Sequence, residues 1–106
     1  MRYEIHGTVM QSLDVFLDQG EKVFTESGGM AWMIGNIQME TNTRGGVMAG
    51  LGRKLAGESL FMTTYTCAGS KGMVAFTPEG PGKVLPMELA AGETLICQKD
   101  AFMCAE

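Results

Sequence analysis

The residues most suggestive of chemistry lie near the middle of the chain, where Gly50-Leu51-Gly52-Arg53-Lys54-Leu55 has the look of a phosphate-binding loop. Such a loop would hold an anion with backbone N–H groups and a lysine at the start of a helix. The pattern fails in detail, because a P-loop needs Gly-Lys followed by Ser or Thr. A dinucleotide fingerprint needs Gly or Ala where Leu55 stands. The sequence therefore does not favour phosphate binding.

Hydrolytic chemistry is also disfavoured. No Gly-x-Ser-x-Gly elbow surrounds Ser59, although Glu58 precedes it. The single histidine, His6, lies in a predicted strand, and no carboxylate or cysteine cluster is spaced along the sequence to join it on one metal. We therefore predict no catalytic residue, no cofactor and no metal site, and an enzyme is the least favoured class.

The cysteines indicate the compartment. Cys67, Cys97 and Cys104 cannot all pair within one chain, and they show no Cys-x-x-Cys spacing. We interpret them as buried thiols of a protein in the reducing cytoplasm. The N-terminal residues alternate and include Glu4 and His6 where a secretory signal would need an unbroken apolar stretch. We therefore predict a cytoplasmic location.

Length and charge narrow the remaining classes. A chain of 106 residues suits one domain, which we place at residues 1–106. No apolar run approaches the roughly 20 residues that a membrane-spanning helix needs, so no transmembrane segment is predicted. The net charge of -4 makes nucleic acid an unfavourable partner, because affinity for the phosphate backbone comes from clustered Lys and Arg.

Short alternations of apolar and polar residues, separated by glycines, predict an all-β fold. Between them, Val47, Leu51 and Leu55 follow one another at a spacing of four residues and predict one short helix, whose apolar stripe would lie on the sheet while Arg53 and Lys54 face water. The strands are predicted at residues 3–8, 9–17, 22–26, 30–34, 37–41, 60–67, 73–77, 83–89, 94–98 and 101–105.

One pattern occurs twice. Leu13-x-Val15-x-Leu17-x-x-Gly20-Glu21-x-Val23-Phe24 is followed 72 residues later by Leu85-x-Met87-x-Leu89-x-x-Gly92-Glu93-x-Leu95-Ile96. Alternating apolar residues around a glycine turn are what a duplicated hairpin requires, although a generic hairpin could match by chance. We predict a first repeat unit at about residues 13–84 and the start of a second at residues 85–106.

The sequence also resembles a known family. The opening MRYEIHG, the segment GEKVFTESGGMAWM, the stretch RGGVMAGLGRKLAGESLF and the later PEGPGKVLPMEL together are similar to bacterial relatives of the altered-inheritance-of-mitochondria family. The resemblance covers essentially the whole chain. It implies a β-rich fold similar to the trp RNA-binding attenuation protein, built from a duplicated unit. Family members usually continue further, so the resemblance implies a fragment or a short member that completes its fold by association.

These observations predict a β-sandwich or double-stranded β-helix of the attenuation-protein type with one short helix. The leading function hypothesis is a non-enzymatic scaffold or protein-interaction module acting as a homo-oligomer. The alternative is a ligand-binding module for nucleic acid or a small molecule, by analogy of fold. The self-association surface is predicted at residues 83–105, because apolar strand edges there would otherwise lie open to water. A second contact, with a protein partner, is predicted at Arg44, Val47, Leu51, Arg53, Lys54 and Leu55.

Overall fold

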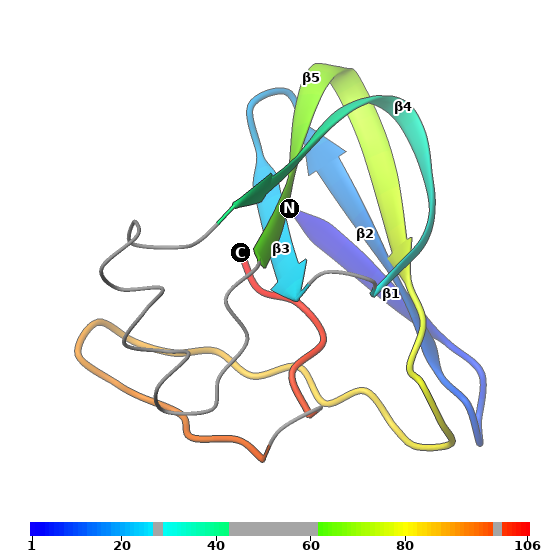
Figure 1. Cartoon of the computed structure of the whole chain (residues 1–106), viewed down its shortest axis with the longest axis vertical. Coiled ribbons are helices and arrows are strands. Elements are labelled where there is room, and N and C mark those ends of the chain that lie inside the picture. Colours follow the sequence, from blue (N-terminus) through cyan, green and yellow to red (C-terminus); the bar gives the residue numbers. More distant parts are fainter. Residues whose placement is uncertain (27–28, 43–61, 99–100) are drawn as a thin grey trace.

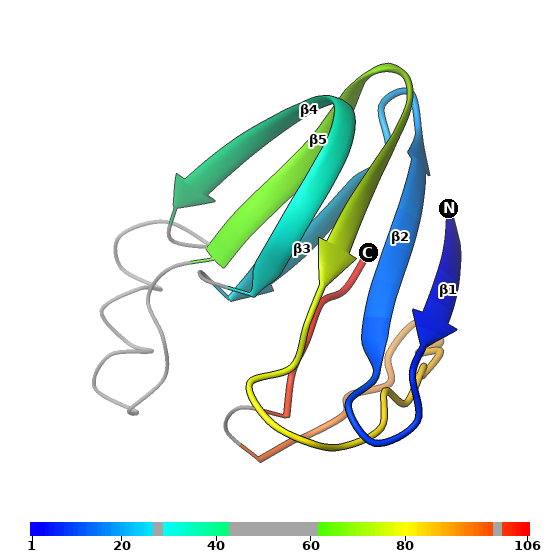
Figure 2. The ribbon, with the colours of Figure 1, turned by 90° about the vertical axis from the view of Figure 1, so that its right-hand side faces the viewer.

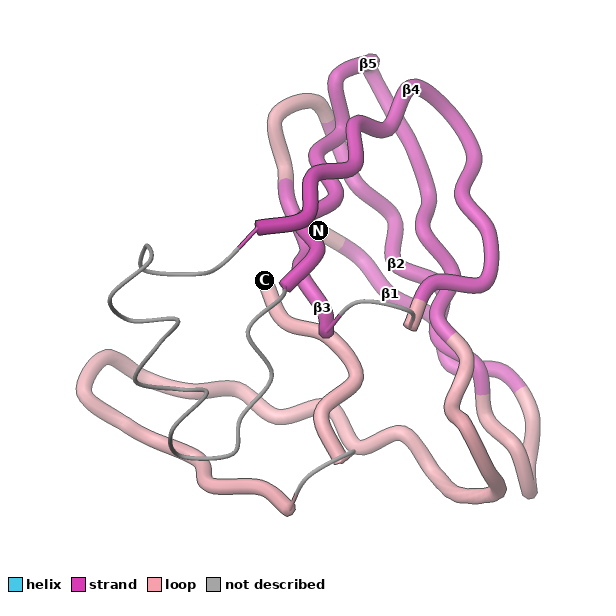
Figure 3. The backbone as a smooth tube through the Cα atoms, viewed as in Figure 1, coloured by secondary structure: helices cyan, strands magenta, loops and turns pink. Residues whose placement is uncertain are grey.

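The computed structural model describes residues 1–26, 29–42, 62–98 and 101–106 (Figures 1 and 3). Within them the regular structure is entirely β, which confirms the predicted class, and no helix there is long and apolar enough to cross a membrane. The short helix predicted near residues 47–55 lies outside the described residues. The strands are β1 (Arg2–His6), β2 (Ser12–Asp18), β3 (Lys22–Glu26), β4 (Met30–Asn42) and β5 (Met62–Phe76).

β5 is the strand to which the others attach. β4 runs antiparallel along one edge of it, from Met30 opposite Phe76 to Asn42 opposite Met62. On the other edge, β3 pairs with the first part of β5 and β2 pairs with the last part. β1 pairs with the outer edge of β2, which gives the order β1-β2-β5-β3 with β4 also beside β5 (Figure 2).

β2 and β3 were predicted to pair with each other as a hairpin, and this prediction was wrong. Both strands instead pair with β5, β3 with its first part and β2 with its last part. The turn that joins them is itself bonded to β5, because Gly20 N–H donates to the Cys67 carbonyl at 2.8 Å and Cys67 N–H donates to the Glu21 carbonyl at 3.0 Å. The turn therefore lies beside the middle of β5, and the strands before and after it pair with the two halves of β5.

β4 and β5 bend together at positions where the sequence predicted that each would be interrupted. The strand continues through residues 35–36 in β4 and through residues 68–72 in β5, and the two arch side by side (Figures 1 and 2). At the bend Gly35 pairs with Gly72, and the register shifts between Gly35 and Ile37. Gly35 has a φ of +93°, and a Cβ there would lie 2.7 Å from the carbonyl oxygen of Lys71. The glycines thus bend the ladder without ending it.

The bend folds the sheet around a small core. Tyr65 and Phe76, from opposite ends of β5, meet edge to face with ring centroids 5.8 Å apart. Their contact requires the two halves of β5 to face each other. Leu13, Val15 and Leu17 share the buried face of β2, as their alternation predicted. The core cluster consists of Leu13, Val15, Leu17, Val23, Tyr65, Cys67, Val74 and Phe76.

The C-terminal residues do not form the strands predicted for them. Residues 83–89 and 94–98 are not in strand conformation, and residues 101–105 contribute a single bridge. In that bridge Phe24 and Ala105 exchange backbone hydrogen bonds of 2.8 and 2.9 Å, and nearby the Thr25 hydroxyl donates to the Met103 carbonyl. An alternating segment becomes a strand only where a neighbouring strand accepts its hydrogen bonds, and none of the five described strands pairs with residues 83–98.

The bend should require glycine at position 35. Gly35→Ala places a side chain on a positive φ and against the backbone of β5, so it should lower the free energy of unfolding by about 1 kcal/mol or more. Gly80→Ala is the matched control, because nothing lies within 4 Å of its added Cβ. Urea denaturation of the two variants measures the difference, and equal stabilities would show that the bend does not need glycine.

Candidate functional site

The contact residues predicted from the sequence are Arg44, Val47, Leu51, Arg53, Lys54 and Leu55. All six lie outside the described residues. The described residues instead bring together three other features. These are a pair of matching turns with differently buried flanks, a group of metal-ligating side chains on β1 and β2, and a shallow depression beside the N-terminus.

The two turns have the same hydrogen bonds. In the first, Asp18 N–H donates to Glu21 Oε1 at 2.7 Å, and Glu21 N–H donates to the Asp18 carbonyl at 3.0 Å. In the second, Ala90 N–H donates to Glu93 Oε1 at 2.9 Å, and Glu93 N–H donates to the Ala90 carbonyl at 3.0 Å. The glycine before each glutamate has a positive φ, 83° at Gly20 and 87° at Gly92. A glycine-glutamate pair therefore specifies the same local turn at both places.

The residues around these turns differ in burial. Leu13 and Leu17 before the first turn are buried against β5. Their sequence counterparts before the second turn, Leu85 and Leu89, are exposed, with 77% and 56% of their surface open. After the turns, Val23 is buried and Phe24 is half-buried, whereas their counterparts Leu95 and Ile96 keep 44% and 91% of their surface open. We call these exposed counterparts the apolar strip, which consists of Leu85, Met87, Leu89, Leu95 and Ile96.

The second feature joins β1 and β2 on the face opposite the core. Glu4 pairs with Asp14 across the two strands, and His6 lies two residues further along β1 on the same face. His6 Nε2 is 3.1 Å from Asp14 Oδ2 and 3.5 Å from Glu4 Oε2. Spacing along the sequence predicted no carboxylate cluster around His6. The strand register nevertheless places Asp14 beside it, and the alternation places Glu4 on the same face.

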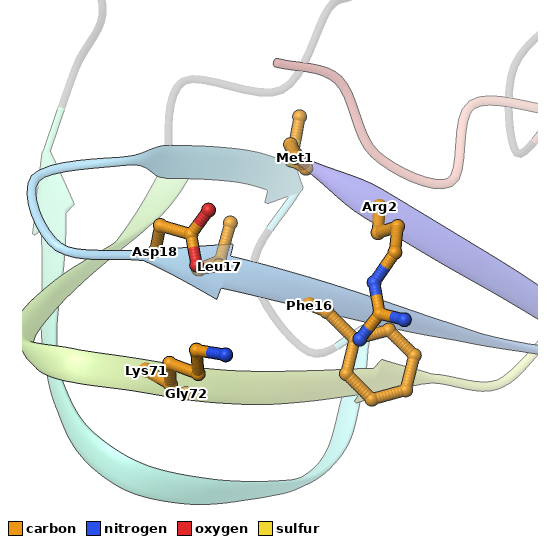
Figure 4. Close-up of a pocket in the computed structure, with 7 residues that line it drawn as sticks. All are labelled: Met1, Arg2, Phe16, Leu17, Asp18, Lys71 and Gly72. Atoms are coloured by element: carbon orange, nitrogen blue, oxygen red, sulfur yellow. The ribbon is translucent and has the colours of Figure 1, made fainter.

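A shallow depression of about 370 Å³ lies at the other end of β1 (Figure 4). The guanidinium carbon of Arg2 sits 4.7 Å from the centre of the Phe16 ring, which is a cation–π contact. The N-terminal ammonium of Met1 bonds Glu21 Oε2 at 2.7 Å. The depression is lined by both cationic and carboxylate side chains. Its lining consists of Met1, Arg2, Phe16, Leu17, Asp18, Lys71 and Gly72.

Glu21 is therefore an acceptor for two groups, the turn backbone and the chain terminus. The hydrogen bond from the N-terminal ammonium and the one from Asp18 N–H hold the pKa of the Glu21 carboxyl below its ordinary value. The hydrogen bond to Glu21 raises the pKa of the Met1 ammonium in return. Both shifts favour the ionised pair.

The cysteines differ from the prediction that all three are buried. Cys67 is buried, as predicted, and its thiol donates to the Gly69 carbonyl at 3.4 Å. Cys97 is exposed, because residues 94–98 do not form the predicted strand. Cys104 is partly buried, and this burial raises the pKa of its thiol to about 11. All three thiols are free.

Replacing Glu21 should make stability less sensitive to acid. Since the pKa of Glu21 is lowered on folding, its contribution is present above the unfolded value near 4.5 and is lost as the pH falls through the lowered folded value. Glu21→Gln should therefore lower the melting temperature at pH 6 and converge with the unmodified chain in acid. Glu93→Gln is the control, since it changes the same turn where no strands flank it. Equal effects of the two variants at pH 6 would contradict the special role of Glu21.

Thiol alkylation should follow burial, and the raised pKa of Cys104 should slow its reaction further. The thiolate is the reactive form, so at pH 8 iodoacetamide should modify Cys97 first and Cys104 much more slowly, while Cys67 reacts on unfolding. Mass spectrometry of the digested chain locates each modification. Cys97→Ser should remove the fast phase, and rapid modification of Cys67 in the folded chain would contradict the core described above.

Comparison with known proteins places the chain in a family. A solved crystal structure of a Streptococcus pyogenes protein from a structural genomics programme is similar, with a TM-score of 0.63 and 26% sequence identity. The match covers 85% of this chain and 43% of that chain, so this chain spans less than half the length of that relative. No curated protein matches. The family model described as mitochondrial biogenesis AIM24 matches residues 3–106, which confirms the resemblance seen in the sequence and shows that the chain belongs to the AIM24 family.

Proposed function

We propose that this chain is a non-enzymatic interaction module that associates with a second copy of itself through the apolar strip. The observation that carries the proposal is the contrast between the two matching turns. The same apolar pattern is buried against β5 beside the first turn and open to water beside the second. The five large apolar side chains of the strip lie exposed within residues 85–96, and large exposed apolar patches mark contact surfaces.

Burial of the strip supplies the driving force. Each large apolar side chain that moves from water into a packed contact contributes about 1.5–3 kcal/mol, which opposes the entropic cost of association. Leu85 and Ile96 are the most exposed of the large hydrophobic residues in the described part of the chain, and they therefore have the most surface to bury. They are the natural centre of such a contact.

A symmetric dimer is the simplest assembly. In a twofold dimer the same patch of each copy faces its counterpart, so one apolar strip covers the other. Residues 83–89 and 94–98, which have no strand conformation in the single chain, would gain backbone partners across the contact. The strip then has the environment that its sequence counterpart finds beside β5.

The same observations support the finer account of the fold. The contact of Tyr65 with Phe76 across the bent strand supports one unit of a sandwich of the attenuation-protein type. The matching turns support a first repeat unit at about residues 13–84 and the start of a second at residues 85–106. The free thiols support a reducing compartment such as the cytoplasm. The contact through Arg44, Val47, Leu51, Arg53, Lys54 and Leu55 remains a proposal.

The experiment compares a double variant, which places two carboxylates in the apolar strip, with a control that places one carboxylate outside it. We expect the unmodified chain to be a dimer at micromolar concentration, and Leu85→Asp with Ile96→Asp to make it a monomer, because two buried carboxylates without partners oppose association. Val9→Asp is the control, since Val9 is also exposed but lies outside the strip. Analytical ultracentrifugation gives the masses, and circular dichroism checks that each variant is folded.

Two results would overturn the proposal. One is an unmodified chain that stays monomeric across the micromolar range. The other is a dimer that survives both substitutions in the apolar strip, which would place the contact elsewhere on the chain. Loss of the dimer in the Val9→Asp control would show that added charge alone disrupts association, and would remove the support for this particular surface.

A further inference from the structure

The side chains of Glu4, His6 and Asp14 form a compact group on the outer face of β1 and β2. One ligand atom from each lies within 4.8 Å of the other two. The group is built on regular strands, because β1 and β2 pair without interruption from Arg2 opposite Phe16 to His6 opposite Ser12. Side chains on paired strands are held more firmly than side chains on loops, so the group is ordered before any ligand arrives.

The three side chains do not provide hydrogen-bond partners for all of their own polar atoms. A single atom, His6 Nε2, faces carboxylate oxygens of both Glu4 and Asp14. A histidine nitrogen carries at most one proton, so it cannot serve both carboxylates with well-directed hydrogen bonds. The second oxygen of Asp14, Oδ1, is buried and has no hydrogen-bond partner within the described part of the chain. Two ionised groups therefore converge where the fold provides one donor.

The surroundings of Asp14 make this unsatisfied oxygen significant. Its side chain is only 16% exposed, whereas those of Glu4 and His6 are 55% exposed. In the sheet Asp14 lies between Glu4 on β1 and Ala75 on β5, and a methyl group offers no hydrogen bond. A carboxylate oxygen shielded from water without a hydrogen-bond partner is costly, and a bound cation would offset that cost.

We propose that Glu4, His6 and Asp14 bind a divalent metal ion, with zinc as the best fit. One imidazole nitrogen and two carboxylates are ligands that zinc accepts, and imidazole sites favour zinc over the alkaline-earth ions. Two ligand atoms about 2.1 Å from a tetrahedral zinc are about 3.4 Å apart. The distances of 3.1 and 3.5 Å from His6 Nε2 to the two carboxylates bracket that separation.

The exposed side of the group leaves room for water as a further ligand. A bound ion would give the Asp14 carboxylate a cation and would tie β1 to β2. β1 is paired only with β2 among the described strands, so such a tie would act on an edge strand. The site is independent of the apolar strip and does not rest on the proposed dimer.

The experiment uses the complete chain after treatment with a chelator and its removal. His6 is the single histidine of the sequence, so its imidazole resonances report the site without ambiguity. We expect zinc to shift these resonances in a saturable way at one ion per chain, and to raise the melting temperature as its concentration increases. Magnesium at the same concentration should do neither, because it rarely accepts imidazole.

Matched variants assign the ligands. Glu4→Gln and Asp14→Asn should each weaken zinc binding by about tenfold or more, measured by calorimetry, since each removes one ligand charge. Glu79→Gln should leave the affinity unchanged, because Glu79 is an exposed carboxylate outside the group. The Cys97→Ser chain should bind equally well, which excludes the exposed thiol as the ligand. Glu4 is exposed, so its variant should fold even if Asp14→Asn does not.

Three results would overturn the proposal. Resonances of His6 that do not move with zinc up to millimolar concentration would show that the group is only an ion pair. Unchanged affinity in Glu4→Gln would show that zinc binds elsewhere. Loss of binding in Cys97→Ser would assign the ion to a thiol.

Discussion

The shared bend of β4 and β5 is the constraint on which the rest of the fold depends. Gly35 and Gly72 are paired at this bend, and each comes closer to neighbouring atoms than a side chain would allow. Because the ladder continues around the bend, one strand can pair with β3 through its first half and with β2 through its last half. The bend also brings Tyr65 over Phe76, so it closes the core as well as the backbone pairing.

Local alternation explains how much of this fold could be predicted. β3 has its predicted bounds, and the ends of β1 and β2 lie within three residues of theirs. In β2 and β3 the alternation of apolar residues, such as Leu13, Val15 and Leu17, matches the observed alternation of burial. The continuity of β4 and β5 could not be predicted, because a glycine that ends a strand and a glycine that bends one have the same local signature. The order of the strands could not be predicted either, because β5 is separated from β2 and β3 by many residues and no local pattern specifies that it pairs with both.

Features of the candidate sites could be predicted where their contacts are local in the sequence, and not where they depend on pairing between strands. The turn at Gly92 and Glu93 forms as its sequence directs, since its hydrogen bonds are all within four residues. The strands expected on either side of it do not form, since their hydrogen bonds would need a partner strand, and none of the described ones is beside them. Spacing along the sequence did not predict a cluster around His6, because Asp14 lies on a different strand. The cross-strand register supplies the missing residue, and register is a property of the folded pair.

β1 is held in a different way from the other strands, and this difference bears on what could regulate the chain. Of its residues only Ile5 packs against the core cluster. The outer face is held by polar contacts, with Arg2 over Phe16 and His6 beside Asp14, while the Met1 ammonium bonds Glu21 at the adjacent turn. Charged side chains on an edge strand also oppose pairing with other chains. Contacts of this kind respond to pH, salt and bound cations, whereas the packed halves of β5 respond mainly to changes in side-chain volume. The edge at β1 is therefore the part of the fold where ionic conditions can shift local opening without disturbing the core.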